Sequence, residues 1–346
     1  DGLSLTGELE TVYAGWRYPD DWRVEGFFVE GPKLVQREGW YYLTSAQGGT
    51  AGPATSHMAV VARSRSPLGP WENSPYNPLV HTWSRGEEWW STGHATIFDT
   101  PHGDSYAAYH GYRAGMHTLG RQTLVAPVHW NAGWPVVDLG DRCDQDGPVA
   151  GGLVRSLVPM DPSDDFDSPS LGVQWRRFDL LPTDHIESGA GSLRIRCSGT
   201  RGRPPQPLVC TPGDVVYRVE VTVGRTELTD DACAGLVLYY DERCFAGLLV
   251  DGKGRVIVAR EGAITSRVLA EEADQTVRLA IVNDRHEVEF HLREHDGWRR
   301  LDAALDVAGY NHNVFGRFLS LRAGLMAVGT GTATFSMFRY ESGVGI

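Results

Sequence analysis

The sequence predicts an all-β protein with two domains, and three observations support this prediction. At 346 residues the chain is long enough to form two separate cores. Its 41 glycines, 11 tryptophans and 13 tyrosines indicate many turns and many aromatic faces. Short strand-like segments recur along the whole chain, and no stretch shows a convincing apolar period of 3.6 residues.

The first 140 residues alternate between short strand-like segments and turns. Turns are expected at residues 66–71 and 101–104, where proline and glycine gather. The strands are expected at residues 40–45, 58–63, 95–98 and 105–110. Such even spacing is typical of sheet repeats of the sandwich or propeller kind.

The second half shows a cleaner alternation of apolar and polar residues, which is typical of a β-sandwich. Asp251-Gly252 between two apolar segments is a strong hairpin signal. A polar stretch separates the halves, so we expect a first domain over 1–145, a linker over 146–163 and a sandwich over 164–346. The sandwich strands are expected at residues 217–223, 235–240, 246–250, 255–259, 277–282 and 288–292.

Charge and cysteine content restrict the functional classes. A net charge of −12 argues against a nucleic-acid partner, because phosphates would be repelled. No apolar run reaches the length of a membrane span, so no membrane partner is expected. Five widely spaced cysteines fit neither a dense disulfide framework nor a zinc site, and free thiols favour a cytoplasmic location over secretion. They are Cys143, Cys197, Cys210, Cys233 and Cys244.

Three residues in the first half are candidates for catalysis. Glu30 lies between the apolar residues 26–29 and Gly31-Pro32, a setting that would partly desolvate the carboxylate and keep it protonated as a general acid. His94 could orient a carboxylate, contact a sugar or bind a metal. Arg121 could pair with the acid's carboxylate. Taken singly, a solvated turn glutamate, a hydrogen-bonded strand histidine and a surface arginine explain them as well.

A series of segments over about residues 8–137 nevertheless resembles glycoside hydrolase family 43 in order and spacing. It begins with Glu30-Gly31-Pro32-Lys33-Leu34 and Gly39-Trp40-Tyr41-Tyr42-Leu43, includes Gly93-His94, and ends with Leu119-Gly120-Arg121 and Ala126-Pro127-Val128. The other matching segments are residues 46–50, 62–71, 77–79 and 110–111. The second half, from residue 164 to 340, resembles the concanavalin-like sandwich of the family's β-xylosidases.

The resemblance implies part of a five-bladed β-propeller and hydrolysis with inversion. Glu30 matches the family's general acid, and His94 and Arg121 match residues that line the same funnel. We expect Trp22 and Phe28 to contact the substrate. A sandwich loop over 310–318, with Phe315, is expected to close one side of the sugar pocket. No cofactor is required, although acidic loops such as residues 164–165 are candidates for a structural calcium.

The chain departs from the family pattern at the general base. In the family this aspartate lies well upstream of the acid, and only 29 residues precede Glu30. Asp20 and Asp21 lie in a polar turn without the family's motif and are expected to be solvated. Since the chain begins with Asp1 rather than Met, we expect it to derive from a longer precursor. An N-terminal fragment of that precursor would supply the base and complete the propeller.

The leading hypothesis is therefore an exo-acting glycosidase that releases β-1,4-linked xylose, α-L-arabinofuranose or both from xylan-derived oligosaccharides. A noncatalytic carbohydrate-binding protein with a degenerate propeller site is the alternative, because the base is absent. A third hypothesis treats the sandwich as a separate lectin-like module.

Overall fold

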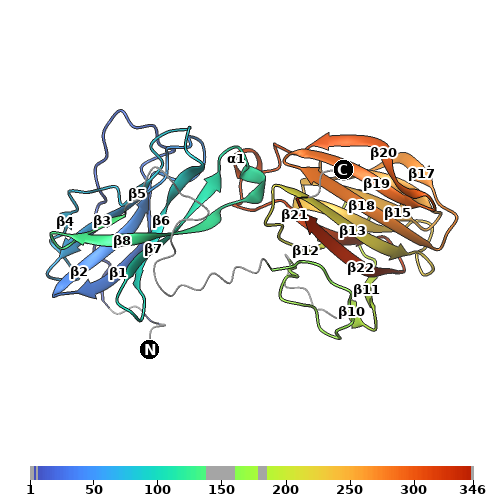
Figure 1. Cartoon of the computed structure of the whole chain (residues 1–346), viewed down its shortest axis with the longest axis horizontal. Coiled ribbons are helices and arrows are strands. Elements are labelled where there is room, and N and C mark those ends of the chain that lie inside the picture. The colour runs from blue at the N-terminus through green and yellow to red at the C-terminus, as the bar shows by residue number, and fades with distance from the viewer. Residues whose placement is uncertain (1–3, 5–6, 138–159, 178–184, 344–346) are drawn as a thin grey trace. The chain divides into compact units, whose positions relative to one another are not determined.

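The chain forms two compact units in a computed structural model that describes residues 4, 7–137, 160–177 and 185–343 (Figure 1). Unit 1 comprises residues 1–115 and 121–156, and unit 2 comprises residues 116–120 and 157–346. The described helices are one α-helical turn, α1 (His312–Phe315), and one 3₁₀ turn, η1 (His117–Leu119). The predicted all-β class is confirmed. The predicted linker over 146–163 lies mostly outside the described residues.

Unit 1 contains two antiparallel sheets that follow each other in the sequence. The first has the order β1-β2-β3-β4, with β5 also paired to β3, and the second has the order β6-β7-β8-β9. This succession of up-and-down sheets corresponds to part of a propeller. The strands are β1 (Val29–Arg37), β2 (Trp40–Gln47), β3 (Met58–Ser64), β4 (Glu72–Asn73), β5 (Val80–His81), β6 (Trp89–Asp99), β7 (Ser105–Arg113), β8 (Gln122–Asn131) and β9 (Trp134–Val137).

The two sheets of unit 1 pack through a shared core. The Tyr42 hydroxyl donates a hydrogen bond of 2.5 Å to the carbonyl of Gly133 and so links the sheets. The Arg63 guanidinium lies 4.3 Å from the ring centroid of Trp40 and 3.9 Å from that of Trp134. The core therefore combines apolar burial with cation–π contacts. Its buried residues are Tyr42, Ala59, Val61, Leu79, Val80, Ala95, Ile97, Ala107, Tyr109, Leu124, Ala126, Val128 and Trp134.

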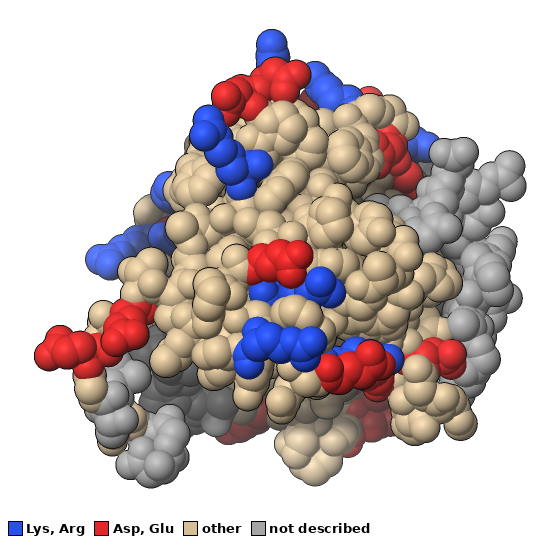
Figure 2. Space-filling view, turned by 90° about the vertical axis from the view of Figure 1, so that its left-hand side faces the viewer, with Lys and Arg blue, Asp and Glu red and all other residues tan. Residues whose placement is uncertain are grey.

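Charged groups on unit 1 are dispersed. Figure 2 shows a face of unit 1 on which basic and acidic side chains are scattered over a largely uncharged surface. A nucleic-acid interface needs a continuous basic stripe. The face in Figure 2 has no such stripe.

Unit 2 is a sandwich of two antiparallel sheets, and the hairpin predicted at Asp251-Gly252 joins β15 to β16. The larger sheet has the order β10 (Ile186–Gly189), β11 (Ser192–Arg196), β22 (Thr332–Ser342), β13 (Val216–Gly224), β18 (Thr276–Asp284), β19 (Glu287–Glu294) and β20 (Gly297–Asp306). The smaller sheet has the order β12 (Leu208–Cys210), β21 (Arg322–Val328), β14 (Cys233–Asp241), β15 (Cys244–Asp251), β16 (Arg255–Arg260) and β17 (Ala263–Glu271).

Period-2 alternation explains why the two sheets of unit 2 face each other. Val219, Val221 and Val223 are fully buried between the sheets, and so are their partners Leu279 and Ile281 on β18. A one-residue shift in register would turn each of these side chains outward. The described cysteines are free, as predicted, and they are buried: Cys197, Cys210, Cys233 and Cys244. Cys143 lies outside the described residues.

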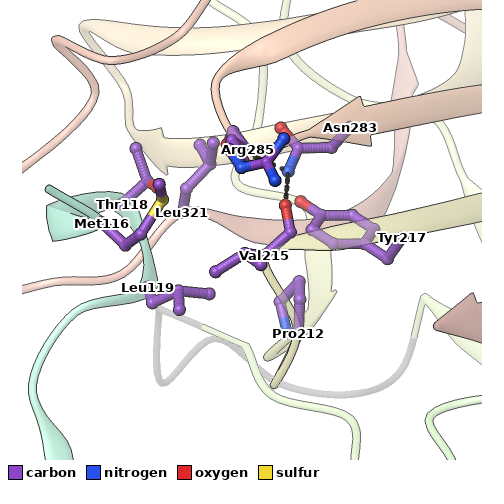
Figure 3. Close-up of a pocket in the computed structure, with 9 residues that line it drawn as sticks. All are labelled: Met116, Thr118, Leu119, Pro212, Val215, Tyr217, Asn283, Arg285 and Leu321. Atoms are coloured by element: carbon purple, nitrogen blue, oxygen red, sulfur yellow. Dashed lines mark hydrogen bonds between the residues drawn. The ribbon is translucent and has the colours of Figure 1, made fainter. Parts of the chain in front are cut away.

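One small cavity lies within unit 2 (Figure 3). It is lined mainly by apolar side chains, together with Asn283, whose amide donates a hydrogen bond to the Val215 carbonyl at 3.1 Å. Its volume of about 10 Å³ fits a single water molecule. The cavity is therefore too small to bind a sugar. No helix in the described part of the chain is long and apolar enough to cross a membrane.

Candidate active site

Three histidines from separate segments of unit 1 converge on one point. His94 lies on β6, His110 lies on β7, and His57 directly precedes β3. One ring nitrogen from each lies within 4.8 Å of the other two. The His57 and His110 rings are stacked, with centroids 5.2 Å apart. Sheet pairing creates this cluster, because His110 faces Gly93 across the β6–β7 ladder.

Gly93, the residue before His94, allows the His57 ring to lie close to the backbone of β6. The β6–β7 register shifts on both sides of Gly93, and His94 adopts a positive φ of 56°. A Cβ atom at Gly93 would lie 2.3 Å from the His57 ring, and His57 is fully buried. The bulge therefore directs His94 toward the cluster while Gly93 leaves room for His57.

Burial keeps the histidine cluster uncharged. It lowers the pKa of His57 to about 3, and the positive charges of His110, His94 and Arg121 lower it further. Burial, followed by the Arg121 guanidinium, lowers the pKa of His110 to about 3. The pKa of His94 is also lowered, chiefly by burial and then by Lys33, while Glu30 opposes this shift. At neutral pH all three rings are therefore neutral.

Glu30, at the start of β1, directly precedes the glycine that lies against this cluster. The β1–β2 register shifts between Glu30 and Lys33, and the Lys33 ammonium donates a hydrogen bond of 2.9 Å to the Gly31 carbonyl. A Cβ atom at Gly31 would lie 2.2 Å from Nε2 of His94. Gly31, the neighbour of Glu30, therefore packs directly against His94. The negative charge of Glu30 acts on the same imidazole.

The environment of Glu30 differs from the prediction. We expected flanking apolar residues to desolvate the carboxylate, but Glu30 is exposed. Phe27 and Phe28 are 60% and 49% exposed, so their rings do not enclose it. The physical reason is that β1 pairs only with β2 among the described strands and forms the edge of its sheet.

Arg121 lies beside a histidine rather than beside the acid. Its Nη1 atom is 3.4 Å from Nε2 of His110. The Glu30 carboxylate forms no hydrogen bond or ion pair with any residue that the structure describes, so the predicted Arg121–Glu30 pair is not present. The guanidinium instead places a fixed positive charge against the histidine cluster.

Trp22 belongs to an aromatic cluster that is connected to the histidines. Its ring stacks on His81 with centroids 4.5 Å apart and an angle of 2° between the planes. Nδ1 of His81 lies 3.1 Å from the His57 carbonyl oxygen. Trp83 packs edge-on against Trp22 and is largely exposed. Aromatic rings of this kind suit stacking against sugars. The substrate role of Trp22 and Phe28 stays a prediction.

Phe315 occupies a different setting from the one expected. It lies at the end of α1, and its ring packs against Tyr240 and Tyr310, with centroids 6.2 and 6.5 Å away. Phe315 is thus partly buried in unit 2. Within the same predicted loop, Phe318 has the more exposed ring at 53%. The role proposed for Phe315 in sugar binding stays a prediction.

The donor set of the cluster restricts which metal it could hold. Among the described residues, His57, His94 and His110 form the one group of three or more close metal-ligating side chains. Calcium prefers oxygen ligands, so three imidazole nitrogens do not suit it. The acidic loop considered for calcium is also engaged, because the Asp164 carboxylate accepts hydrogen bonds from Phe166 N, Gln174 and Trp175.

Sequence reasoning missed His57 and His110. His110 lies in the segment His110-Gly111, which resembles the family, but its sequence context indicates no chemical role for the imidazole. Nothing local marks His57, which precedes an apolar strand like many buried polar residues. Only the fold reveals that both rings meet His94.

Gly93→Ala should disrupt the cluster. The added methyl group would overlap the buried His57 ring, so His57 or β6 must shift. We expect a loss of about 1–3 kcal/mol in the free energy of unfolding of unit 1, measured by urea denaturation, together with a large loss of any hydrolytic activity. Gly86→Ala is the matched control, because its Cβ would lie 3.4 Å from its nearest neighbour, Ser84 Oγ. Equal effects of the two substitutions would contradict this account of Gly93.

Unit 1 should lose stability as the pH falls from about 6.5 toward 3. The pKa values of His57 and His110 are lowered in the folded chain, so the unfolded chain binds more protons in this range. Each histidine should remove up to about 1.4 kcal/mol per pH unit. Urea denaturation between pH 7 and 4 should show a shallower slope for His110→Gln than for wild type. The exposed His102→Gln should leave the slope unchanged; identical slopes for all three proteins would refute the explanation.

Both units match known sequence families. Residues 1–135 match the glycosyl hydrolases family 43, and residues 163–341 match the β-xylosidase C-terminal concanavalin A-like domain. A putative β-xylosidase of Escherichia coli (strain K12) is 29% identical over 260 residues, which cover 66% of this chain and 47% of that protein. A non-reducing end α-L-arabinofuranosidase of Bacteroides ovatus is 36% identical over 180 residues, which cover 49% of this chain and 33% of that protein.

Solved structures share the fold. A family 43 protein of Bacillus licheniformis has a TM-score of 0.83 at 23% identity, covering 97% of this chain and 68% of that chain. A xylan β-1,4-xylosidase of Bacillus halodurans has a TM-score of 0.75 at 24% identity, covering 91% and 65%. The chain spans about half the length of the Escherichia coli relative and a third of the Bacteroides ovatus one. With matches to the family in both of its units, the chain belongs to the glycosyl hydrolases of family 43 that carry this concanavalin A-like domain.

Proposed function

We propose that this chain carries the acid side of the active site of an inverting glycosidase. Its substrates would be xylan-derived oligosaccharides, from which it releases β-1,4-linked xylose, α-L-arabinofuranose or both. The observation that carries this proposal is the position of Glu30 beside the neutral His94, in a histidine cluster against which Arg121 places a positive charge. The names of the curated relatives, a putative β-xylosidase and an α-L-arabinofuranosidase, support the substrate class.

Glu30 would donate its proton to the glycosidic oxygen as the bond breaks. The neutral His94 does not compete as a proton donor at neutral pH and can orient the carboxylate or a sugar hydroxyl. Arg121 and Lys33 place positive charge near His94, the imidazole on which Glu30 also acts. Because Glu30 is exposed in the present chain, its enclosure would come from bound substrate and from additional protein.

The general base would come from outside these 346 residues. Of the groups that shift the pKa values of the three histidines, Glu30 is the one carboxylate among the described residues. An inverting site needs a second carboxylate roughly 6.5–9.5 Å from the acid. Asp20 does not suit this role, since it is exposed in a turn and lies 3.6 Å from Arg17.

The edge strand β1 supports an additional protein segment as the missing partner. Val29 and Leu34 on this strand are exposed, and so are Phe27 and Phe28 just before it. An exposed apolar sheet edge favours pairing with another strand. We infer that a preceding segment, either continuous with this chain or cleaved from the same precursor and still bound, pairs here and brings the base aspartate.

The product of hydrolysis tests the proposed reaction. The protein in its active form should release single xylose or arabinose units from xylotriose or an arabinose-substituted xylo-oligosaccharide. Proton NMR during the first minutes should show the anomer opposite to that of the bond cleaved. Retention of configuration, or cleavage to shorter oligosaccharides without monosaccharide, would contradict the proposal. Binding of these sugars without hydrolysis would instead support a noncatalytic carbohydrate-binding protein, which the exposed Glu30 favours.

A further inference from the structure

The outward face of the larger sheet of unit 2 carries arginines gathered around one tryptophan. While the valines of β13 point into the core, Arg218 and Glu220 alternate with them and point outward. The ladder pairs Ala280 on β18 with His291 on β19, and Arg293 on β19 with Trp298 on β20. These side chains therefore lie on one face of four strands that are adjacent in the sheet, β13, β18, β19 and β20. Figure 1 shows the strands themselves.

Trp298 is the centre of this face. The guanidinium carbon of Arg218 lies 4.3 Å from its ring centroid, that of Arg278 lies 5.5 Å away, and that of Arg293 lies 5.8 Å away. Trp298 is half-buried, and Ala280 is fully buried. Part of the indole surface therefore remains exposed among the arginines.

Two carboxylates, one buried and one half-buried, hold part of this cluster in place. Glu220, whose side chain is 8% exposed, accepts hydrogen bonds from Arg218 at 3.0 Å and Arg278 at 2.8 Å. Glu289 similarly accepts a bond from Arg300 at 2.8 Å. The Nε atoms of Arg218 and Arg278 are buried without a hydrogen-bond partner among the described residues. The guanidinium groups of Arg218 and Arg278 are thus held in position, yet only some of their N–H groups donate hydrogen bonds.

Around Trp298 the arginines outnumber their paired carboxylates. Arg218, Arg278 and Arg293 have one paired carboxylate among them, Glu220. The acidic residues Asp284, Glu287 and Asp306 on the same face lie at the other ends of their strands, and Glu341, opposite Arg218 on β22, forms no ion pair in the described part of the chain. His291 adds no positive charge at neutral pH, since burial chiefly lowers its pKa although Glu289 raises it. Arg293 is exposed and has no carboxylate within 4 Å in the described part of the chain. Nearby charges do form pairs, such as Arg299 with Glu294 at 2.5 Å. A local positive excess is notable in a chain with a net charge of −12.

Cation–π packing alone explains why an arginine lies against Trp298, but it does not explain why three of them surround one ring. Like charges held close together repel each other, and a bound anion would relieve this repulsion. Arginine forks match the geometry of carboxylates. A half-exposed indole beside them provides a flat surface for the apolar face of a sugar ring.

We propose that this face binds a glycan that bears a uronic acid. The sugar ring would pack on Trp298, and the carboxylate would bind to Arg293 with the support of Arg278. The site is separate from the histidine cluster, which lies in unit 1. That the ligand is a glycan rests on the proposed function, whereas its negative charge follows from the arginines alone.

Calorimetry can test this binding with the full chain carrying Glu30→Gln, so that the probe is not cleaved. The probe is a xylotriose that bears one 4-O-methylglucuronic acid, compared with neutral xylotetraose and inorganic phosphate. We expect the acidic probe to bind at least tenfold more tightly than either comparison ligand. Arg293→Gln and Trp298→Ala should each weaken this binding at least tenfold. Arg299→Gln, which removes a neighbouring arginine already paired with Glu294, should change it less than twofold.

The outcomes separate this proposal from the proposed function. The proposal would be overturned if the acidic probe did not bind, or bound no more tightly than xylotetraose or phosphate. It would also be overturned if Arg299→Gln weakened binding as much as Arg293→Gln does. Circular dichroism would verify that Arg293→Gln, a surface substitution, remains folded. Arg293→Gln in the otherwise unchanged protein should leave the hydrolysis of neutral xylotriose unaltered, so failure of hydrolysis and failure of this binding are read independently.

Discussion

Glu30→Gln should reduce the hydrolysis of xylotriose by roughly 10²–10⁴-fold, because the sugar leaving group needs a proton that glutamine cannot donate. The same variant should lose much less activity toward a nitrophenyl xyloside, whose leaving group departs without protonation. The two rates, measured as kcat/KM on the active protein, distinguish a general acid from a residue that only binds substrate. A binding residue would affect both substrates alike.

Glu38→Gln is the matched control for this comparison. Glu38 lies at the turn of the same β1–β2 hairpin, is exposed, and contacts Arg37 only at 3.9 Å. We expect its rates to remain within about twofold of wild type on both substrates, as for most surface substitutions. If Glu30→Gln lost equal activity on both substrates, or none, Glu30 would not be the acid.

Arg225→Lys should destabilise unit 2 by about 2–4 kcal/mol, since four backbone carbonyls would lose the hydrogen bonds of a buried guanidinium. Arg225 directly follows β13, is 6% exposed, and donates hydrogen bonds of 2.6–3.1 Å to four backbone carbonyls. A lysine ammonium is a compact group and cannot reproduce the planar guanidinium contacts. The four carbonyls belong to Gly252, Glu272, Ala273 and Asp274.

Hydrogen exchange is the suitable measurement, because a chain of two units need not unfold in one step. Peptides from β14 to β16 should exchange faster in Arg225→Lys, while peptides from unit 1 should remain unchanged. Arg260→Lys is the control, since Arg260 is exposed at the end of β16. Unchanged protection in Arg225→Lys would show that these hydrogen bonds contribute little.

Strands were predictable from sequence where the pattern is local. Residues 246–250 and 255–259 lie within β15 and β16, and Asp251-Gly252 lies at their turn, as expected. Apolar alternation and turn chemistry determine such hairpins within about ten residues. The propeller and the concanavalin-like sandwich required the resemblance to a family, because the order of strands in a sheet depends on contacts between distant segments.

The site was predictable only in part, for the same physical reason. Glu30, His94 and Arg121 stand in recognisable short segments, but the histidine cluster forms through the pairing of β6 with β7 and the position of His57. The burial expected for Glu30 was wrong, since apolar neighbours in sequence do not enclose a side chain on an edge strand. Phe315 packs inside unit 2 because Tyr240 and Tyr310, distant in sequence, meet it there.

The composition of the active species tests the central claim most directly, namely that this chain supplies the acid and that further protein supplies the base. Fractions that hydrolyse xylotriose should be collected and analysed by denaturing mass spectrometry. We predict that every active fraction contains polypeptide beyond these 346 residues, as a longer chain or as a bound fragment with an aspartate-containing propeller strand. Full activity in a fraction that holds only these 346 residues would contradict the account.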